Sequence, residues 1–452
     1  MLYGNAAQID ITPSLGTLIN GEFTSRYATK IADPLFAKAL FLKDNQTRIL
    51  IVVVDICVMK RDFLDPLKAR IYQETGIPVG NQLISSTHAH STGSIADLLM
   101  GHVDLAYRNN LAEKLLELAK KSVLQEQKVK IAFGKVLKPE HLTCRRYKMQ
   151  DSYQPWNPVL KTTDAVKTNP FGHESEIIEQ TSIPDPEVCF LGIKGEDDQW
   201  IGILANYGLH YVGDCERGTI TADYFGYFSN KLADLIGSAS MINMMSNGTS
   251  GEINIWDFIG GDRYPKNYHE KSKLIGEDIA EAVYTSLDEL VWESDARLDV
   301  LYQDLPLNKR TVSPAILAES YKMLAATYYE AIAYTDEDLY EKVYAREQVL
   351  LESIPDQILF PVQCFRIGHS IIGALGGEFF SQSGKILKEE CESYFSICLA
   401  NDYVGYVPPA LEFKNGGYET WRCRSSFLEE NAEDKVLNCL VDMIKKMKNN
   451  EQ

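Results

Sequence analysis

The sequence lacks the segments that mark a membrane-spanning or exported protein. Its most apolar stretch, residues 49–59, is too short to cross a hydrocarbon core of about 30 Å and includes Asp55. The first five residues, Met1-Leu2-Tyr3-Gly4-Asn5, form neither the charged nor the apolar part of a signal peptide. We therefore expect a cytoplasmic protein with no membrane span.

Closely spaced cysteine pairs are also missing. The nine cysteines are scattered and odd in number, and no two of them form a CxxC pair. This pattern argues against a disulfide framework and against a structural zinc knuckle. Reduced thiols that pack like small apolar side chains fit best.

Positive charge is scarce. The chain has 45 Lys and Arg against 63 Asp and Glu, a formal net charge of -18. Such a field repels nucleic acid and anionic lipid headgroups, so the expected partner is a small-molecule substrate. The sequence leaves the oligomeric state open.

What the sequence does contain is an alternation of short apolar runs with amphipathic helices. We expect strands at 48–54, 82–86, 188–193, 201–206, 241–245, 370–375 and 395–399, and helices at 63–74, 111–123 and 427–447. This order predicts an α/β fold of mixed, multi-layer sheets covered by helices. We expect one domain over residues 1–452.

Two segments depart from this alternation. Residues 314–351 are rich in Ala, Tyr, Glu and Leu and predict a helical hairpin, inserted at about 308–356. Residues 147–181 show little periodicity and contain three prolines, which predicts a long surface loop. The sequence leaves open whether this loop closes over a site as a lid.

Polar clusters follow several of the expected strands. They are Thr87-His88-Ala89-His90-Ser91, His210, Asn247-Gly248-Thr249-Ser250-Gly251-Glu252, Gly376-Gly377-Glu378 and Asn401-Asp402-Tyr403. Because ligands bind at the carboxyl ends of strands in open α/β sheets, these clusters are expected to converge on one crevice.

Each histidine of these clusters has two interpretations, a functional one and a structural one. If the strand of residues 82–86 continues, His88 and His90 point to one side, so that one binds metal and the other binds substrate. With His210 they supply enough imidazole for zinc, although lone histidines are more often hydrogen-bonded surface or core residues. Glu378 is either a ligand beside two glycines or the first-turn carboxylate of a helix that begins near Phe379. Tyr406 and Tyr418 are by default packing residues.

Five stretches in a fixed order resemble the catalytic domain of the neutral/alkaline non-lysosomal ceramidases, and more closely a ceramidase-like bacterial branch. They are Ile9-Asp10-Ile11-Thr12-Pro13, Asp33-Pro34-Leu35-Phe36-Ala37-Lys38-Ala39-Leu40, Ile84-Ser85-Ser86-Thr87-His88-Ala89-His90-Ser91, Asp185-Pro186-Glu187-Val188 and Tyr403-Val404-Gly405-Tyr406-Val407. The resemblance implies one metal ion, zinc or another divalent cation, held by His88, His210, Glu378 and Tyr406. It further implies that His90 contacts the reacting group, that Arg145 or Arg146 binds substrate, and that Tyr418 is a second site tyrosine.

The chain departs from this family in two ways. The serine regarded as the family's nucleophile falls on Asn254, after Gly251-Glu252-Ile253. The immunoglobulin-like domain that follows the catalytic domain in the secreted ceramidases is not expected here.

Taken together, these features predict a zinc-dependent hydrolase that cleaves an amide or ester by metal-activated water. His90 and Tyr418 would donate hydrogen bonds to the oxyanion, and Arg145 or Arg146 would fix an anionic or polar group. Glu252 is either a general base or a structural carboxylate. The alternatives are a metal-containing protein that binds a small ligand or carbohydrate without turnover, and a carbohydrate-active lyase or hydrolase whose paired arginines hold an acidic sugar.

Overall fold

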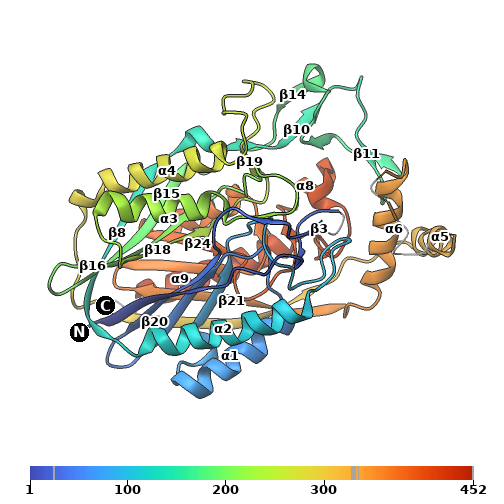
Figure 1. The fold of residues 1–452 in the computed structure, drawn as a ribbon. Coiled ribbons are helices and arrows are strands. Elements are labelled where there is room, and N and C mark those ends of the chain that lie inside the picture. Colours follow the sequence, from blue (N-terminus) through green and yellow to red (C-terminus); the bar gives the residue numbers. More distant parts are fainter. Residues whose placement is uncertain (24–25, 327–331, 334, 450–452) are drawn as a thin grey trace.

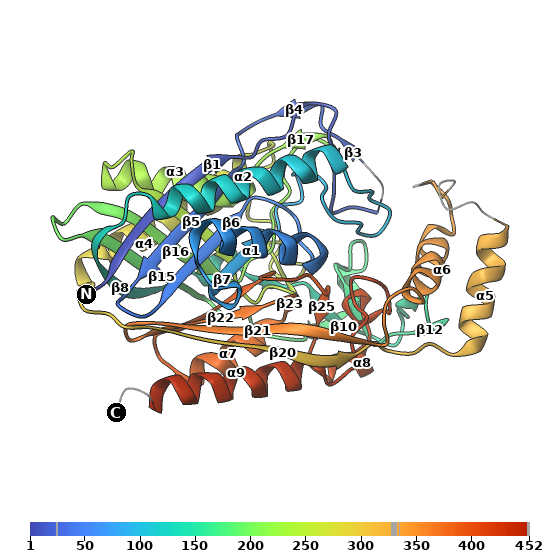
Figure 2. The same ribbon diagram turned by 90° about the horizontal axis from the view of Figure 1, so that it is seen from below.

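The protein is a stack of four layers, helix, sheet, sheet and helix, which Figures 1 and 2 show from two directions. The computed structural model describes residues 1–23, 26–326, 332–333 and 335–449. This architecture confirms the predicted α/β fold of mixed sheets covered by helices.

The larger sheet has eight strands in the order β18, β16, β15, β8, β1, β5, β6 and β7. Their bounds, in that order, are Ile242–Asn247, Trp200–Tyr207, Glu187–Gly195, Gln127–Leu137, Tyr3–Asp10, Phe36–Lys43, Arg48–Val54 and Gln82–Ser86. The pairs β16·β18 and β6·β7 are parallel, and the other neighbours are antiparallel.

Four helices cover the outer face of this sheet: α1 (Arg61–Thr75), α2 (Leu105–Val123), α3 (Asp223–Ile236) and α4 (Glu270–Thr285). One apolar core joins α1 and α2 to β1, β5 and β6, and a second joins α3 and α4 to β15, β16 and β18. The helices expected at 63–74 and 111–123 are α1 and α2, each with the apolar stripe that its spacing predicts.

The smaller sheet has four strands in the order β20 (Leu298–Asn308), β21 (Gln357–Ile367), β22 (Ser370–Leu375) and β24 (Tyr394–Cys398). One of its faces packs on the larger sheet and the other on α7 (Ser381–Glu390) and α9 (Ala432–Asn449). Strands buried on both faces read as continuous apolar runs, which is why residues 48–54 and 370–375 could be recognised in the sequence.

Three parallel strand–helix–strand units organise the molecule. They are β6-α1-β7, β16-α3-β18 and β22-α7-β24, and two belong to the larger sheet and one to the smaller. The carboxyl ends of their strands precede the polar clusters that contain His88, His210 and Glu378.

The helical hairpin lies between β20 and β21, as expected, and consists of α5 (Pro314–Ala325) and α6 (Leu339–Leu351). Both helices project from one end of the molecule (Figure 2). Within the part of the chain that the structure describes, no helix is long and apolar enough to cross a membrane. The nine cysteines, all within the described residues, form no disulfide.

The prediction of an irregular loop at 147–181 was wrong. This segment and its flanks contain β10 (Arg146–Met149), β11 (Trp156–Asn157), β12 (Thr162–Thr163), β13 (Val166–Thr168) and β14 (Ile177–Gln180). These strands form a three-stranded and a two-stranded sheet, but each strand is too short to give a periodic signal.

The remaining elements are short. They are β2 (Leu18–Ile19), β3 (Arg26–Tyr27), β4 (Lys30–Ile31), β9 (Thr143–Cys144), β17 (Thr219–Ile220), β19 (Ile253–Asn254), β23 (Glu378–Phe379), β25 (Tyr406–Val407) and α8 (Glu412–Asn415).

Candidate metal centre and active site

His88, His210 and Glu378 meet at one buried point. One ligand atom from each lies within 4.8 Å of the other two. The Oε2 atom of Glu378 is 3.5 Å from Nε2 of His88 and 3.7 Å from Nε2 of His210. All three side chains are buried, and each follows a strand of a different parallel unit.

Each of these side chains is oriented by its second polar atom. Nδ1 of His88 lies 2.9 Å from the carbonyl of Cys57, and Nδ1 of His210 lies 3.2 Å from the carbonyl of Ser250. A carbonyl can only accept, so Nδ1 donates in both rings and both Nε2 atoms face Glu378. Tyr403 donates to Oε1 of Glu378 at 2.8 Å, and Oε2 is buried without a hydrogen-bond partner among the described residues.

This donor set fits a metal ion. Ligands at 2.0–2.1 Å in a tetrahedron are about 3.4 Å apart, close to the 3.5 and 3.7 Å that separate the Glu378 oxygen from the two imidazole nitrogens. A buried carboxylate oxygen with no partner costs free energy unless a cation balances it. Two neutral imidazoles and a carboxylate suit zinc.

The charges at this point are strongly coupled. Burial alone would lower the pKa of His88, but the Glu378 carboxylate raises it to about 10. The pKa of His210 is held well below its usual value by burial and by the charges of Arg145 and His88. Without a cation, one proton therefore balances Glu378, and a divalent ion would take that proton's place.

The strand of residues 82–86 does not continue into the HxH motif. β7 ends at Ser86, and His88 has a left-handed backbone with φ of 72°. The two rings nevertheless meet, with 3.2 Å between their Nε2 atoms. His90 stacks on Tyr211 at 3.7 Å between ring centroids.

Glu378 is not a first-turn helix residue, because it lies in β23 and α7 begins at Ser381. β23 pairs in parallel with β25, and this register places Glu378 opposite Tyr406. The carboxylate at the start of α7 is instead Glu252, whose two oxygens each accept from the Ser381 N–H at 3.0 Å. Glu252 is fully buried and does not line the cavity described below, so the geometry does not favour a general base.

The adjacent arginines point in different directions. Arg145 lines the cavity and donates to Gly251 O, to the Tyr406 hydroxyl at 3.1 Å and to Glu419. Arg146 is fully buried behind it, in ion pairs with Glu412 and Glu419 of 2.6 and 2.7 Å.

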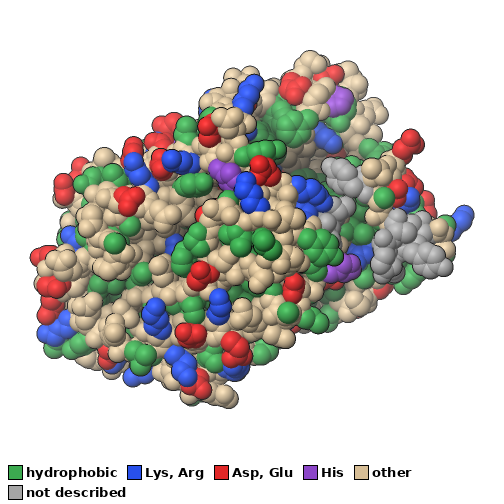
Figure 3. All heavy atoms as spheres, viewed as in Figure 1, with side chains coloured by type: hydrophobic (Ala, Val, Ile, Leu, Met, Phe, Trp, Pro, Cys, Tyr) green, Lys and Arg blue, Asp and Glu red, His purple; other side chains and the backbone are tan. Residues whose placement is uncertain are grey.

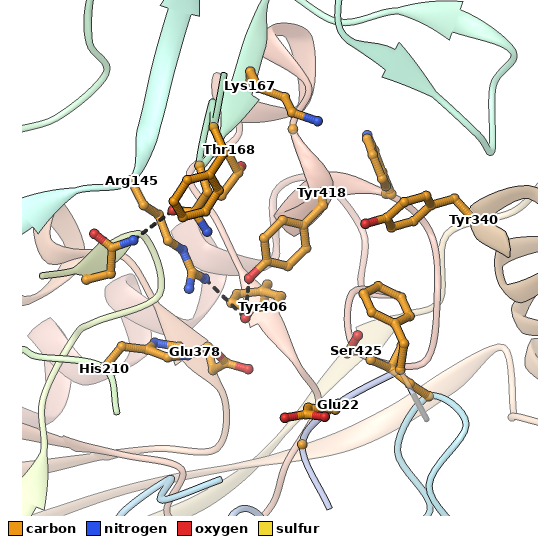
Figure 4. Close-up of a pocket in the computed structure, with 18 of the residues that line it drawn as sticks. Glu22, Arg145, Lys167, Thr168, His210, Tyr340, Glu378, Tyr406, Tyr418 and Ser425 are labelled. Carbon is orange, nitrogen blue, oxygen red and sulfur yellow. Dashed lines mark hydrogen bonds and ion pairs between the residues drawn. The ribbon is translucent and has the colours of Figure 1, made fainter. Parts of the chain in front are cut away.

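The two predicted tyrosines lie together beside the metal point. The hydroxyls of Tyr406 and Tyr418 are 3.0 Å apart, with Arg145 bonded to the first (Figure 4). Burial raises the pKa of both phenols above the usual value. Asn254 lines the same cavity, where its amide donates to Oδ1 of Asn169 at 2.7 Å.

The metal point, Arg145 and the two tyrosines form the floor of a cavity of about 890 Å³. Its walls come from the start of the chain, from residues 153–171, from residues 254–256 and from α6, and Figure 4 shows Glu22, Lys167 and Tyr340 around the floor residues. On the face drawn in Figure 3, Lys and Arg side chains are scattered among Asp and Glu rather than gathered in one patch.

Sequence reasoning missed two residues of the floor. Tyr403 was noticed only as part of a polar cluster, and nothing local shows that its hydroxyl reaches Glu378. Tyr211 directly follows His210, but its stacking on His90 depends on a contact across the fold.

No family model matches the sequence, and no curated protein matches it as a relative. Two solved structures resemble it over 99% of its length. One is a neutral ceramidase from Pseudomonas aeruginosa, with a TM-score of 0.71, 14% identity and 75% of that chain covered. The other, described as a ceramidase complexed with C2, has a TM-score of 0.70, 14% identity and the same coverage of 75%. The chain therefore has the neutral ceramidase-like fold that the five motifs predict.

Proposed function

We propose that this protein is a metal-dependent hydrolase that cleaves an amide bond, with an ester as the near alternative. The observation that carries the proposal is the meeting of His88, His210 and the unpartnered Glu378 oxygen at the floor of an open cavity. The likeness to two ceramidases supports the reaction class.

The proposed metal ligands are His88, His210, Glu378 and Tyr406, with one zinc or other divalent ion per chain. When bound, such an ion polarises a carbonyl and lowers the pKa of water to about 7. Tyr406 qualifies because it lies opposite Glu378 in the β23–β25 pair.

Three further side chains act on the substrate in this proposal. Arg145 and the Tyr418 hydroxyl donate to the oxygen on which negative charge develops. Burial and the charges of His88 and Arg26 hold the pKa of His90 well below its usual value, so its imidazole is neutral at pH 7. His90 can therefore take a proton from the attacking water and pass it to the leaving nitrogen.

The nucleophile in this proposal is water and not a side chain, because the Asn254 amide is not nucleophilic. Hydrolysis forms one carbon–oxygen bond from water, breaks the carbon–nitrogen bond and leaves the proton on the amine. Arg146 and Glu252 have no part in these steps, because both lie behind the floor, Arg146 in ion pairs with Glu412 and Glu419 and Glu252 bonded to Ser381.

Removal and restoration of the metal tests this function. The purified protein is treated with a chelator and assayed on chromogenic anilides and esters before and after zinc is added. We expect turnover to vanish and return, and His90→Ala to keep its metal while losing at least about 100-fold in kcat. Retained metal with no turnover across the panel would contradict the hydrolase and leave a metal-containing binding protein.

A further inference from the structure

The cavity is unusually rich in aromatic rings. Of the 36 described residues that line it, twelve are Phe, Tyr or Trp, against 10% of the whole chain. Trp156, Phe171 and Trp256 are 46%, 59% and 39% exposed, and all three line this cavity. Among the described residues, no other Phe or Trp side chain is exposed. Large apolar rings gathered in one open hollow mark a binding surface.

These rings are held in place. The Trp156 indole donates to Glu341 of α6 at 3.1 Å, and the Trp421 indole donates to Asp164 at 2.7 Å. Phe171 packs edge-to-face on Trp256, with ring centroids 5.2 Å apart. Fixed rings present flat faces to a ligand with little loss of side-chain entropy on binding.

Aromatic pairs also form the wall opposite Arg145. Phe23 packs edge-to-face on Tyr340 at 5.5 Å, and Tyr344 on Trp421 at 5.2 Å. Figure 4 shows Tyr340 across the cavity from Arg145, with Tyr418 between them. The aromatic surface therefore lines the path that a substrate follows from the mouth to the floor.

The spaces between the rings are polar and carry both signs of charge. Lys167, Glu337 and Glu341 line the cavity, as does a Glu22–Arg217 ion pair of 2.8 Å. The branched aliphatic residues among the described lining are only Leu98, Leu99, Val166, Val212 and Ile255. A long acyl chain would desolvate the charged groups without hydrogen-bonding them, which costs free energy.

We propose that this cavity binds an oligosaccharide, and that the bond cleaved is the amide of an N-acylated amino sugar within it. The C–H groups on the flat face of a sugar ring are slightly positive and suit the negative face of an aromatic ring. The hydroxyl groups at the sugar's edge match the charged and amide groups between the rings. The inference rests on the proposed amide hydrolysis, because only the reacting group must reach the floor.

The reaction balances without a further reactant. Water adds its oxygen to the acyl carbon, the carbon–nitrogen bond breaks, and the nitrogen takes one proton from the water. The products are a carboxylic acid and an oligosaccharide with one free amine.

Binding and turnover are tested together on the zinc-loaded protein. The probes are the β-1,4-linked N-acetylglucosamine tetramer, a ceramide in mixed micelles and an N-acetylated dipeptide amide. We expect calorimetry to detect binding of the tetramer, and mass spectrometry to show the loss of one acetyl group. Trp156→Ala and Trp256→Ala should each raise KM for the tetramer about tenfold or more, with metal content and kcat kept.

Trp292→Ala is the matched control, because Trp292 packs on Trp200 outside the cavity and should leave KM unchanged. Preference for ceramide or for the peptide, with tryptophan variants that behave like wild type, would overturn the sugar assignment while leaving the hydrolase intact. Tryptophan-dependent binding of the tetramer without turnover of any amide would instead support the sugar site and contradict the hydrolase.

Discussion

The floor of the cavity and the layer directly behind it each contain a buried glutamate and a buried arginine, but the two pairs differ in their hydrogen bonds and ion pairs. On the floor, one oxygen of Glu378 accepts no hydrogen bond from the described residues, and Arg145 lies against the Tyr406 hydroxyl. In the layer behind, Glu252 has its oxygens satisfied by Ser381 and Ser182, and Arg146 is enclosed by two carboxylates. All four side chains are buried. What distinguishes the candidate site here is a buried carboxylate oxygen that accepts no hydrogen bond from the described residues, and not the residue type.

The largest effect on stability is expected from a substitution of Arg146, in the layer behind the floor. Arg146→Met leaves Glu412 without an ion-pair partner and Glu419 with Arg145 alone, and we expect a loss of about 3–5 kcal/mol in the free energy of unfolding. Urea denaturation measures it. Lys148→Met, on the exposed side of the same strand β10, is the control and should change stability by less than about 0.5 kcal/mol. Similar losses in both variants would contradict the structural role of Arg146.

Glu252 should make the stability depend on pH. Burial raises its pKa from 4.5 to about 7, so the folded state binds this proton more tightly than the unfolded chain does. The stabilisation is fully present below pH 4.5 and is lost as the pH rises towards 7, by about 3 kcal/mol in total.

Glu252→Gln tests this, because the amide does not titrate. Relative to wild type, the variant should gain stability between pH 4.5 and 7 and level off above that range. Parallel stability curves for the two proteins would show that Glu252 does not titrate as proposed.

A smaller effect, on metal affinity, is expected at Tyr403, which holds Glu378 in place. Tyr403→Phe removes the hydrogen bond to Oε1 of Glu378 but keeps the ring, so metal affinity should fall about 10- to 100-fold. Competition with a chromogenic zinc chelator measures the affinity. Tyr302→Phe, at the exposed edge of β20, is a control whose affinity should equal that of wild type.

Much of this arrangement could be predicted from the sequence, for reasons that differ between residues. The strand at 370–375 was found to its exact bounds because it is buried on both faces, and the HxH, Gly-Gly-Glu and Tyr-Val-Gly-Tyr motifs lie at strand ends. Convergence of His88, His210 and Glu378 followed from the expectation that polar clusters gather at one edge.

The choice between Arg145 and Arg146 could not be made in the same way. Neighbours on an extended segment point to opposite sides, and which side is the cavity depends on Glu412 and Glu419, far along the chain. The assignment of Glu252 likewise depends on where α7 begins, which is set by the β23–β25 pairing. The short strands of 147–181 gain their stability from neighbours and leave no pattern of their own.

The smallest effect is expected at Asn254, which lines the wall without being a ligand. Asn254→Ser should leave metal content unchanged, because the asparagine amide bonds to Asn169 and to the backbone of Trp256. A large drop in bound metal, measured by mass spectrometry, would place this side chain within the metal site.

The metal content of Glu378→Gln beside Glu252→Gln tests the central claim most directly. Both substitutions replace a buried glutamate by the neutral glutamine, which has nearly the same size. Only the first removes a carboxylate that faces two imidazoles. We expect near one equivalent of metal in wild type and in Glu252→Gln, and a loss of nearly all of it in Glu378→Gln. Equal metal in the two variants would contradict a cation held by His88, His210 and Glu378.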